Sequence, residues 1–380
     1  MTRGSKPFVL VVSPQPLDAT TTLFFGHLQL RMPEAIRVVR YGTDEMAVSL
    51  GDAAAVVLVR GLFEFSDVAR CARALRIPLY YFLDDNFIVL REQGGVAAKF
   101  VRRYFLGDVR AALRDFAGVL LATPALVSYF SEQDLHPRLF LFPPVIDAKI
   151  LVMPRVARPG VTVAFFGGRH LHRQLLDTIV PAVRRLALQR PVRLLAVGVP
   201  EPIPASEGLV VIQPPYDESY TRGLRALTTE GVNVFVHPVA AGMANNVYKN
   251  PHALISALAL GAVPVVSNAP PYDALGPFGV ALTCEESEAA WLTALTQAVT
   301  DDTLRSTLGA RLVTYCAQQF SGSPNRAVIE TMLAGYTPRG WAQTLWRRGI
   351  ARGYQVLNLA GRVAARVTKA ARRKTVTAAA

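Results

Sequence analysis

The sequence predicts an α/β protein built from two halves, each with a parallel β-sheet covered by helices, followed by a basic helical tail. Short apolar runs rich in β-branched residues alternate with helical stretches, which is typical of a parallel sheet with both faces covered. A stretch rich in proline between residues 143 and 160 separates two such series. The tail is predicted from its charge, because no acidic residue occurs after Glu330.

Composition supports a large folded chain. Its 380 residues are enough for two domains of ordinary size, and a content of 51% hydrophobic and 18% charged residues excludes global disorder. No apolar run approaches the roughly 20 residues that span a bilayer. Cys71, Cys284 and Cys316 are odd in number and far apart, which argues against a disulfide framework or a zinc site and indicates a reducing compartment.

The first half begins with a strand. Its opening residues, MTRGSKPFVLVVSPQP, are charged and then apolar for only five positions, so they predict a strand and not a signal peptide. Further apolar runs predict a first domain over residues 1–150, with helices near 66–76 and 96–116. The expected strands are Phe8–Val12, Ala54–Val59, Pro78–Leu83, Gly118–Ala122 and Leu139–Phe142.

A second series of strands and helices follows a linker at residues 151–160. We expect it to form a second domain over residues 161–330. Two Rossmann-like halves with a cleft between them are the simplest architecture for this order of elements. The expected strands are Val161–Phe166, Arg193–Val197, Leu209–Ile212, Val232–Val236 and Val263–Val266.

The segment NNVYKNPHALISALALGAVPVVS, residues 245–267, is the most informative part of the chain. Its polar start is expected to open an apolar helix that ends at Gly261, where glycine can take the left-handed conformation, and the strand VPVVS follows. The free N–H groups of a helix start favour an anionic ligand, and Lys249 adds a positive charge there. The segment therefore predicts a diphosphate site, with Asn245 and Asn246 contacting phosphate or sugar.

This segment resembles the donor-binding signature of the GT-B glycosyltransferases, in particular the retaining family-4-like group. Fragments elsewhere are similar to the same family, including RIPLYYFLDDN at 76–86, GVLLATPALVSYF at 118–130, FPPVIDAKI at 142–150 and VNVFVHPV at 232–239. The resemblance covers about residues 5–330 and stops at the tail. The matching positions of the signature are Asn246, Lys249, Ala259, Gly261, Pro264, Val265, Val266 and Ser267.

The resemblance implies a GT-B fold, with an N-terminal acceptor domain and a C-terminal domain that binds a nucleotide diphosphate sugar. It implies sugar transfer with retained anomeric configuration, without a tightly bound metal and without another cofactor. The sequence itself predicts no metal site, since no cluster of ligand residues accompanies the pair Asp84–Asp85.

The stretch VTVAFFGGRHLHRQLLDTI at 161–179 places a glycine pair between a strand and a helix. Gly167 and Gly168 allow the backbone to approach a phosphate, although the pair falls short of the dinucleotide fingerprint. By resemblance, Arg169 and Arg173 hold the donor diphosphate. The alternative is that Arg169 is a capping surface residue and Arg173 is solvated. The two histidines of this stretch are expected at the rim of the site.

Asp84 and Asp85 follow a predicted strand and should lie at the carboxyl edge of the first sheet, where open α/β sheets bind ligands. Two adjacent carboxylates on a loop are expected to point in different directions, so that at most one faces the cleft. That one would accept a hydrogen bond from a sugar or act as a base. The alternative is that Asp85 and Asn86 only cap a helix or turn.

One departure from the family lies in the donor segment. Family members carry two glutamates eight residues apart, at the positions that Tyr248 and Ser256 occupy here. Ser256 can still bond a ribose hydroxyl, but more weakly than a carboxylate. Tyr248 lies at the position near the reacting sugar, yet it cannot stabilise positive charge as a carboxylate does. The alternative for both residues is simple helix packing.

The tail, residues 331–380, carries ten of the positive charges and leaves the rest of the chain with 31 basic and 28 acidic residues, a net +3 of the total +13. Residues 340–374 have helical periodicity and predict a basic amphipathic helix that binds an anionic membrane surface. The alternatives are a solvated extension or, less favoured without an aromatic platform, a nucleic-acid arm. Trp346, Ile350, Val356, Leu357, Ala360, Val363 and Val367 fall on the predicted apolar side, and Arg347, Arg348, Arg362, Arg366, Lys369, Arg372 and Arg373 on the basic side.

Together these features predict a cytoplasmic glycosyltransferase held peripherally at the inner face of the cell membrane. It would transfer a sugar to a glycan or lipid-linked acceptor, as in surface polysaccharide biosynthesis. The second hypothesis, motivated by Tyr248 and Ser256, is a catalytically inactive GT-B-like scaffold that binds a nucleotide sugar or glycan.

Overall fold

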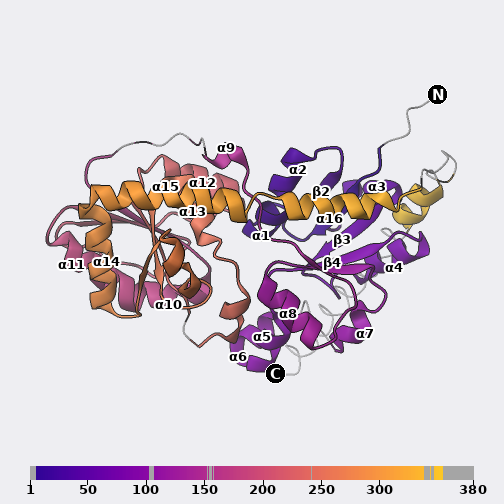
Figure 1. Cartoon of the computed structure of the whole chain (residues 1–380), viewed down its shortest axis with the longest axis horizontal. Coiled ribbons are helices and arrows are strands. Elements are labelled where there is room, and N and C mark those ends of the chain that lie inside the picture. Colours follow the sequence, from indigo (N-terminus) through magenta and orange to yellow (C-terminus); the bar gives the residue numbers. More distant parts are fainter. Residues whose placement is uncertain are drawn as a thin grey trace, which may run out of the picture.

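A computed structural model describes residues 6–101, 107–151, 153, 156, 158–240, 242–337, 343 and 346–353. It shows two α/β domains side by side, and the long α15 and α16 lie along one side of both (Figure 1). The order of elements confirms the α/β class and the two Rossmann-like halves.

The first domain contains a six-stranded sheet with the order β2-β1-β3-β4-β5-β6 among the described residues. Every neighbouring pair is parallel. The edge strand β2, IRVVR, was missed because its two arginines face outward and interrupt the apolar run. The strands are β1 (Val9–Ser13), β2 (Ile36–Arg40), β3 (Ala55–Val59), β4 (Leu79–Leu83), β5 (Gly118–Leu121) and β6 (Leu139–Leu141).

The second domain contains a parallel sheet of six strands in the order β12-β11-β10-β7-β8-β9, again among the described residues. The three-residue strand β12 was missed because so short a run has no readable alternation. The strands are β7 (Val161–Phe166), β8 (Val192–Val197), β9 (Leu209–Ile212), β10 (Val234–His237), β11 (Val263–Ser267) and β12 (Leu282–Cys284).

The two strand orders place a switch point in each sheet, where the chain direction along the sheet reverses and a crevice forms at the carboxyl ends of the strands. In the first sheet it lies between β1 and β3, and in the second between β7 and β10. The residues that follow these strands, notably Arg60 after β3 and Gly167 after β7, therefore stand where open sheets bind ligands.

Helices pack around the single sheet of the first domain, but the helix expected at 96–116 is wrong as a single element. Gly107 has a positive φ of 81°, and Asp108 caps a new helix by accepting from the backbone of Ala111. The helical elements are α1 (Ala19–Thr21), a π-helical turn η1 (Thr22–Gly26), α2 (His27–Arg31), α3 (Asp44–Asp52), α4 (Ser66–Ala74), α5 (Phe87–Gln93), α6 (Gly95–Val101), α7 (Val109–Leu113) and α8 (Pro124–Glu132).

The remaining described residues contain further short helical turns and three longer helices. Helix α9 (Ala148–Leu151) ends at the first residue of the predicted linker. The remaining elements are η2 (Arg169–Leu171), α10 (His172–Gln174), η3 (Leu175–Ile179), α11 (Val180–Ala187), α12 (Tyr220–Thr228), η4 (Ala244–Tyr248), α13 (Ala253–Leu260), η5 (Asp273–Phe278), α14 (Glu288–Thr300), α15 (Asp302–Gln319) and α16 (Ser323–Ala334).

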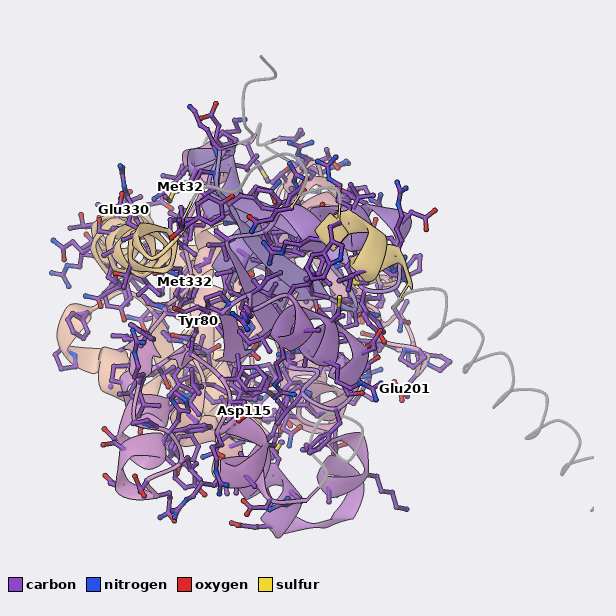
Figure 2. The ribbon with its side chains drawn as sticks, turned by 90° about the vertical axis from the view of Figure 1, so that its right-hand side faces the viewer. Met32, Tyr80, Asp115, Glu201, Glu330 and Met332 are labelled. Carbon is purple, nitrogen blue, oxygen red and sulfur yellow. The ribbon has the colours of Figure 1, made fainter. Side chains whose placement is uncertain are left out.

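The chain crosses back to the first domain after α15. Helix α16 contacts β1 and β6, and the amide of Asn325 donates to the carbonyl of Pro143 over 2.8 Å. Figure 2 shows α16 from its end, with Glu330 exposed and Met332 buried against the first domain. The sequence had placed residues up to 330 with the second domain, whereas α16 packs on the first.

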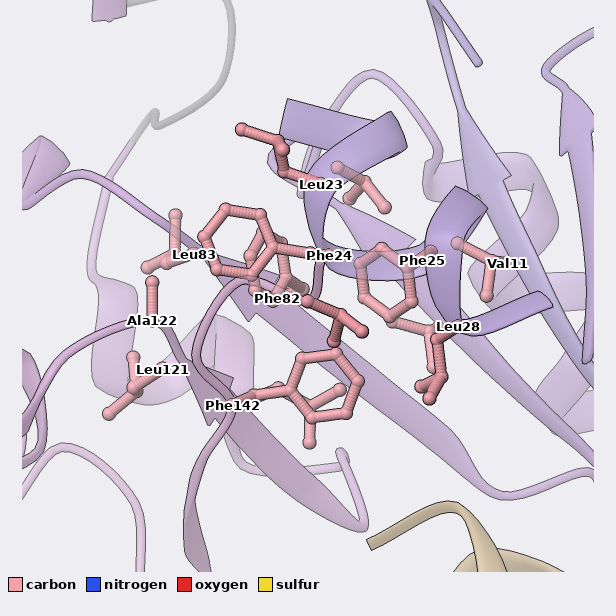
Figure 3. Close-up of a cluster of buried hydrophobic side chains, with 14 of the residues drawn as sticks. Val11, Leu23, Phe24, Phe25, Leu28, Phe82, Leu83, Leu121, Ala122 and Phe142 are labelled. Carbon is pink, nitrogen blue, oxygen red and sulfur yellow. The ribbon is translucent and has the colours of Figure 1, made fainter. Parts of the chain in front are cut away.

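Aromatic packing organises the core behind the first sheet. Phe24 and Phe25 from η1 meet Phe82 of β4 at centroid distances of 4.7 and 5.0 Å, and Phe25 stacks on Phe142 at 5.1 Å (Figure 3). These buried rings hold η1, β4 and the residue that follows β6 together, and so position the loop after β4.

His27 at the start of α2 is buried in this domain, and its Nδ1 lies 2.7 Å from the carbonyl oxygen of Val145. Burial lowers the pKa of His27 below its ordinary value. Below a pH of about 6.5 the unfolded chain therefore binds more protons than the folded one, and stability falls as the pH falls.

We expect His27→Gln, which keeps a donor for Val145, to flatten this dependence. Between pH 6.5 and 5, wild type should lose up to ~1.4 kcal/mol of unfolding free energy per pH unit more than the variant, because one proton must be taken up on unfolding. Urea unfolding at several pH values measures the two slopes. Equal slopes would mean that His27 is protonated in the folded protein.

The root of the predicted tail is described and is helical over residues 346–353. Arg347 is buried and donates to the carbonyl of Leu75 over 3.0 Å. Arg348 pairs with Asp52, with Nε and Nη2 each donating to one carboxylate oxygen. Gly51 permits this approach, since a Cβ there would lie 2.9 Å from the Cα of Arg348. The predicted division of faces is therefore wrong here: both arginines face the first domain and Trp346 is 62% exposed. The remainder of the predicted helix, residues 354–374, lies outside the described residues.

Candidate functional site

The loop after β4 in the first domain meets the segment that follows β10 in the second. Asp84, Asp85 and Asn86 form that loop, and Asn86 accepts from the backbone of Val89 to cap α5, as one of the alternatives predicted. Asn245 reaches this loop from the second domain. The carboxyl edges of the two sheets therefore contact each other at the predicted Asp-Asp pair.

Asp84 is fully engaged within the first domain. Its Oδ1 accepts from Nε of Arg60 over 2.6 Å, its Oδ2 accepts from the same guanidinium, and the hydroxyl of Thr20 donates to Oδ2 over 2.7 Å. Arg60 holds a left-handed φ of 62°, a conformation that costs on the order of 1–3 kcal/mol for a residue other than glycine. This bidentate pair leaves Asp84 little capacity to bind substrate, so its placement indicates a structural role.

Asp85 is held by both domains. Its Oδ1 accepts from the amide of Asn245 over 2.7 Å, and its Oδ2 lies 3.3 Å from Nη2 of Arg60. Burial alone would favour the neutral acid, but the charges of Lys249 and Arg60 lower the pKa of Asp85, so it is ionised at neutral pH. The expectation that the two carboxylates diverge is wrong, since both contact Arg60.

The donor segment folds differently from the single helix that the sequence predicts. Residues 244–248 form the short turn η4, Lys249 is extended with a ψ of 155°, and α13 begins only at Ala253. Pro251 explains the break, because proline disfavours a helical conformation in the residue before it. The predicted stop is confirmed: Gly261 has a φ of 64° and is followed by β11.

Two adjoining pockets lie at the carboxyl edge of the second sheet. The larger has a volume of about 490 Å³ and the smaller about 80 Å³, and Gly167, Gly168 and His252 line both. Ala19 of the first domain also lines the larger pocket, so the start of α1 closes one of its sides. Aromatic rings form another wall, where Phe166 stacks on Tyr220 at 6.1 Å and Tyr216 lies 5.7 Å from Phe166.

Lys249 and the glycine pair meet in the smaller pocket. Nζ of Lys249 lies 3.5 Å from Nε2 of His170, which stands at the exposed rim as predicted. A Cβ on Gly167 would lie 2.9 Å from the ring of Phe165, so the space requires glycine there. This wall offers bare backbone beside a positive charge, an arrangement suited to an anionic group.

The histidines around this pocket are held neutral. Although His170 is exposed at the rim, desolvation of its ring by the pocket walls and the charge of Lys249 lower its pKa to about 4. Burial likewise lowers the pKa of His237 and His252. Nδ1 of His237 lies 3.0 Å from the hydroxyl of Tyr272. Neutral rings supply hydrogen bonds, so among the described side chains of this pocket the positive charge comes from Lys249.

The two residues that replace the family's glutamates have other partners. The ring of Tyr248 packs edge-on against Tyr129 of the first domain at 5.4 Å, and its carbonyl accepts from Thr123 over 3.0 Å. The hydroxyl of Ser256 lies 2.9 Å from that of Tyr220, and Ser256 lines the larger pocket. These positions leave the ribose hypothesis for Ser256 open but do not support a catalytic role for Tyr248.

The structure does not bring Arg173 to either pocket lining. Its side chain is 87% exposed and pairs with Asp177, which agrees with the alternative that it is solvated. The backbone of Arg169 begins η2, and its side chain lies outside the described part of the structure. Asn246 lines the smaller pocket, with its amide donating to the carbonyl of Ala240 over 2.9 Å.

Sequence reasoning missed several residues of the site, above all Arg60. The signal was available, because Arg60 directly follows the expected strand Ala54–Val59, just as Asp84 follows Pro78–Leu83. The ring of His252 had no comparable signal, since it comes from a turn position. Within the described residues, no group of three or more potential ligand side chains is arranged to hold a metal ion.

Known structures share this architecture. No protein-family model and no curated protein sequence matches the chain. Sucrose-phosphate synthase from Thermosynechococcus elongatus superposes with a TM-score of 0.57 and 14% identity over 86% of this chain and 97% of that one. An alpha-glucosyltransferase in complex with UDP-glucose and DNA containing an abasic site gives 0.61 and 8%, over 86% and 99%.

A third similar structure is WaaG, a glycosyltransferase involved in lipopolysaccharide biosynthesis, with a TM-score of 0.54 and 14% identity over 86% of this chain and 100% of that one. At these identities the similarity concerns the fold. Together with the two facing parallel sheets, it confirms the GT-B architecture that the resemblance implied.

Proposed function

We propose that the protein is a glycosyltransferase that transfers a sugar from a nucleotide diphosphate sugar. The observation that carries the proposal is that Lys249 lines one pocket with the Gly167–Gly168 backbone, while its charge also acts on the ionised Asp85 of the first domain. Similar structures are glycosyltransferases by their titles, one of them in complex with UDP-glucose.

The two pockets suggest how a donor would be divided. The smaller pocket, with Lys249 and the glycine pair, suits the diphosphate. The larger pocket suits the nucleoside, since Phe166, Tyr216 and Tyr220 offer aromatic surface and Ser256 a hydroxyl. Asn246, which lines the smaller pocket, would contact phosphate or sugar.

In the reaction, the bond between the anomeric carbon and the donor phosphate oxygen breaks, and a bond to the acceptor hydroxyl oxygen forms. The nucleoside diphosphate leaves, and its phosphate takes the proton of that hydroxyl in the retaining route that the resemblance implies. Asp85 is ionised at neutral pH because its pKa is lowered, so it suits stabilisation of positive charge at the sugar better than proton abstraction. This is the contribution that Tyr248 cannot make.

The second candidate is an inactive scaffold that binds a nucleotide sugar or glycan through the same cleft. The observation that favours it is that Tyr248 and Ser256 both stand in place of carboxylates and both have protein partners. The two candidates share donor binding and differ in turnover.

A thermal-shift screen of the full chain against uridine, guanosine and thymidine diphosphate sugars tests the proposal. A ligand that binds only the folded protein raises its melting temperature. A shift selective for one donor, followed by release of its nucleoside diphosphate with an acceptor or water, supports the transferase. Binding without turnover supports the scaffold. A folded protein that binds no donor contradicts the transferase and leaves only a scaffold that binds a glycan.

We also propose that the acceptor is a glycan or lipid-linked molecule and that the protein binds the inner face of the cell membrane through residues 340–374. The support is the charge of the tail and the exposed Trp346 at its docked root. No helix in the described part is both long and apolar enough to cross a bilayer. No nucleic-acid partner is expected.

Deleting residues 354–380 should abolish sedimentation with phosphatidylglycerol-containing vesicles. The deletion removes six basic side chains, each contributing about 1 kcal/mol near an anionic surface, and keeps the docked contacts of Arg347 and Arg348. The melting temperature should therefore stay unchanged. Phosphatidylcholine vesicles and high salt are the controls. Undiminished sedimentation of the shortened chain would dismiss the tail as the anchor.

A further inference from the structure

The sequence predicts that Asn245 contacts the nucleotide-sugar donor. In the structure, however, both polar atoms of its side chain form hydrogen bonds with the first domain. Its Nδ2 donates to Oδ1 of Asp85 over 2.7 Å, and its Oδ1 accepts from the backbone N–H of Asn86 over 2.6 Å. The residue is 1% exposed. It belongs to the second domain and, through these two bonds, acts on the first.

Asn245 lies within an interdomain seam, which we define as residues 242–250 with their partners in the first domain. The other seam bonds involve main chain on one side. The amide of Gln93 bonds the carbonyl of Gly242 over 2.8 Å and the N–H of Ala244 over 3.3 Å, and Asn250 donates to the carbonyl of Ala122 over 3.1 Å. The seam is therefore held at several points that do not depend on the side chain at position 245.

Within the first domain, Asp85 is held loosely. Arg60 directs two bonds at Asp84, one of them 2.6 Å long, and reaches Oδ2 of Asp85 only at 3.3 Å. The shorter bond of Asp85 comes from Asn245. Separation of the two domains would break that bond and release the χ1 and χ2 angles of Asp85.

We infer that Asn245 is a positioning residue that orients Asp85 for sugar transfer only when the two domains are closed. This role rests on the proposed function and assigns to Asn245 a task other than donor binding. It would couple the chemical step to closure and protect the bound donor from reaction in the open state.

The test compares Asn245→Ala with Gln93→Ala in the full chain, using the donor selected by the screen. Gln93→Ala removes two seam bonds without touching Asp85. Asn245→Ala should lower turnover at least tenfold, while its affinity for the nucleotide sugar stays within about threefold of wild type. The acid limb of its pH–rate profile should move to higher pH, because the ionised carboxylate of Asp85 loses a hydrogen bond. Gln93→Ala should change neither turnover nor that limb more than about twofold.

Hydrogen exchange provides a readout that does not need activity. The Asn86 amide, which donates to Asn245, should exchange at least tenfold faster in Asn245→Ala and at the wild-type rate in Gln93→Ala. Donor affinity lost more than tenfold with normal turnover at saturation would overturn the inference and make Asn245 a donor ligand. Should wild type bind no donor, the proposed function fails, while unchanged Asn86 exchange in Asn245→Ala would separately overturn the positioning contact.

Discussion

Asp85→Asn is expected to lower the rate of sugar transfer by a factor of about 100 or more while the donor still binds. Asparagine fills the same space and still accepts from Asn245, but it carries no charge with which to stabilise the developing positive charge on the sugar. Burst or single-turnover kinetics at saturating donor would measure the chemical step, and the thermal shift would report donor binding.

Asp84→Asn provides the sharpest contrast, because the same chemical change occurs one residue away. It breaks the bidentate contact with Arg60 and should cost about 3 kcal/mol of unfolding free energy, as expected for a partly buried charge left unpaired. Asp85→Asn should lose far less stability and far more turnover. Asp177→Asn, at an exposed position, controls for the removal of one negative charge. Full activity in Asp85→Asn would remove that residue from the reaction.

Lys249→Ala is expected to weaken nucleotide-sugar binding at least tenfold. A charge-assisted hydrogen bond to phosphate contributes about 1.5–3 kcal/mol, and each 1.4 kcal/mol is a factor of ten in affinity. Titration calorimetry or the concentration dependence of the thermal shift would give the dissociation constant, with the nucleoside diphosphate as a second ligand. Because Lys249 contacts the diphosphate in this proposal, both ligands should lose affinity.

Arg173→Ala is the matched control for Lys249→Ala. It removes the same charge from the same domain, but its side chain is exposed and paired with Asp177. Its affinity for either ligand should stay within about twofold of wild type, as for a surface substitution. Equal losses in the two variants would point to a general effect of net charge and contradict a phosphate site at Lys249.

Much of the fold could be predicted because strands and stops are local features of the sequence. Runs such as VLVVS, AVVLV and VTVAFF form β1, β3 and β7 nearly where expected, since β-branched residues favour the extended backbone wherever both faces are buried. The elements that were missed or misplaced depend on context. Strand β2 is defined by its pairing with β1, and α13 starts late because Pro251 prevents Asn250 from taking a helical conformation.

The site was predicted in its parts more than in its assembly. The positions of Gly167, Gly168, Lys249 and Ser256 on the pocket walls follow from motif and strand end, which lie close in sequence. Arg173 fits the same local pattern but turns outward, because its neighbours on η3 leave it beside Asp177. The spacing of four residues between Arg169 and Arg173 does not indicate which side of the helical stretch faces the cleft.

By itself, the sequence determined the α/β class, the two halves and the glycine that ends α13, because neighbouring residues decide each of these. Only the tertiary structure decided that Arg60 engages Asp84, that Tyr248 turns to Tyr129 and that Asn245 holds Asp85. Asn245 and Asp85 are 160 residues apart and belong to different domains. Their contact depends on two strand orders and on how the domains close, so it is a property of packing and not of any local pattern.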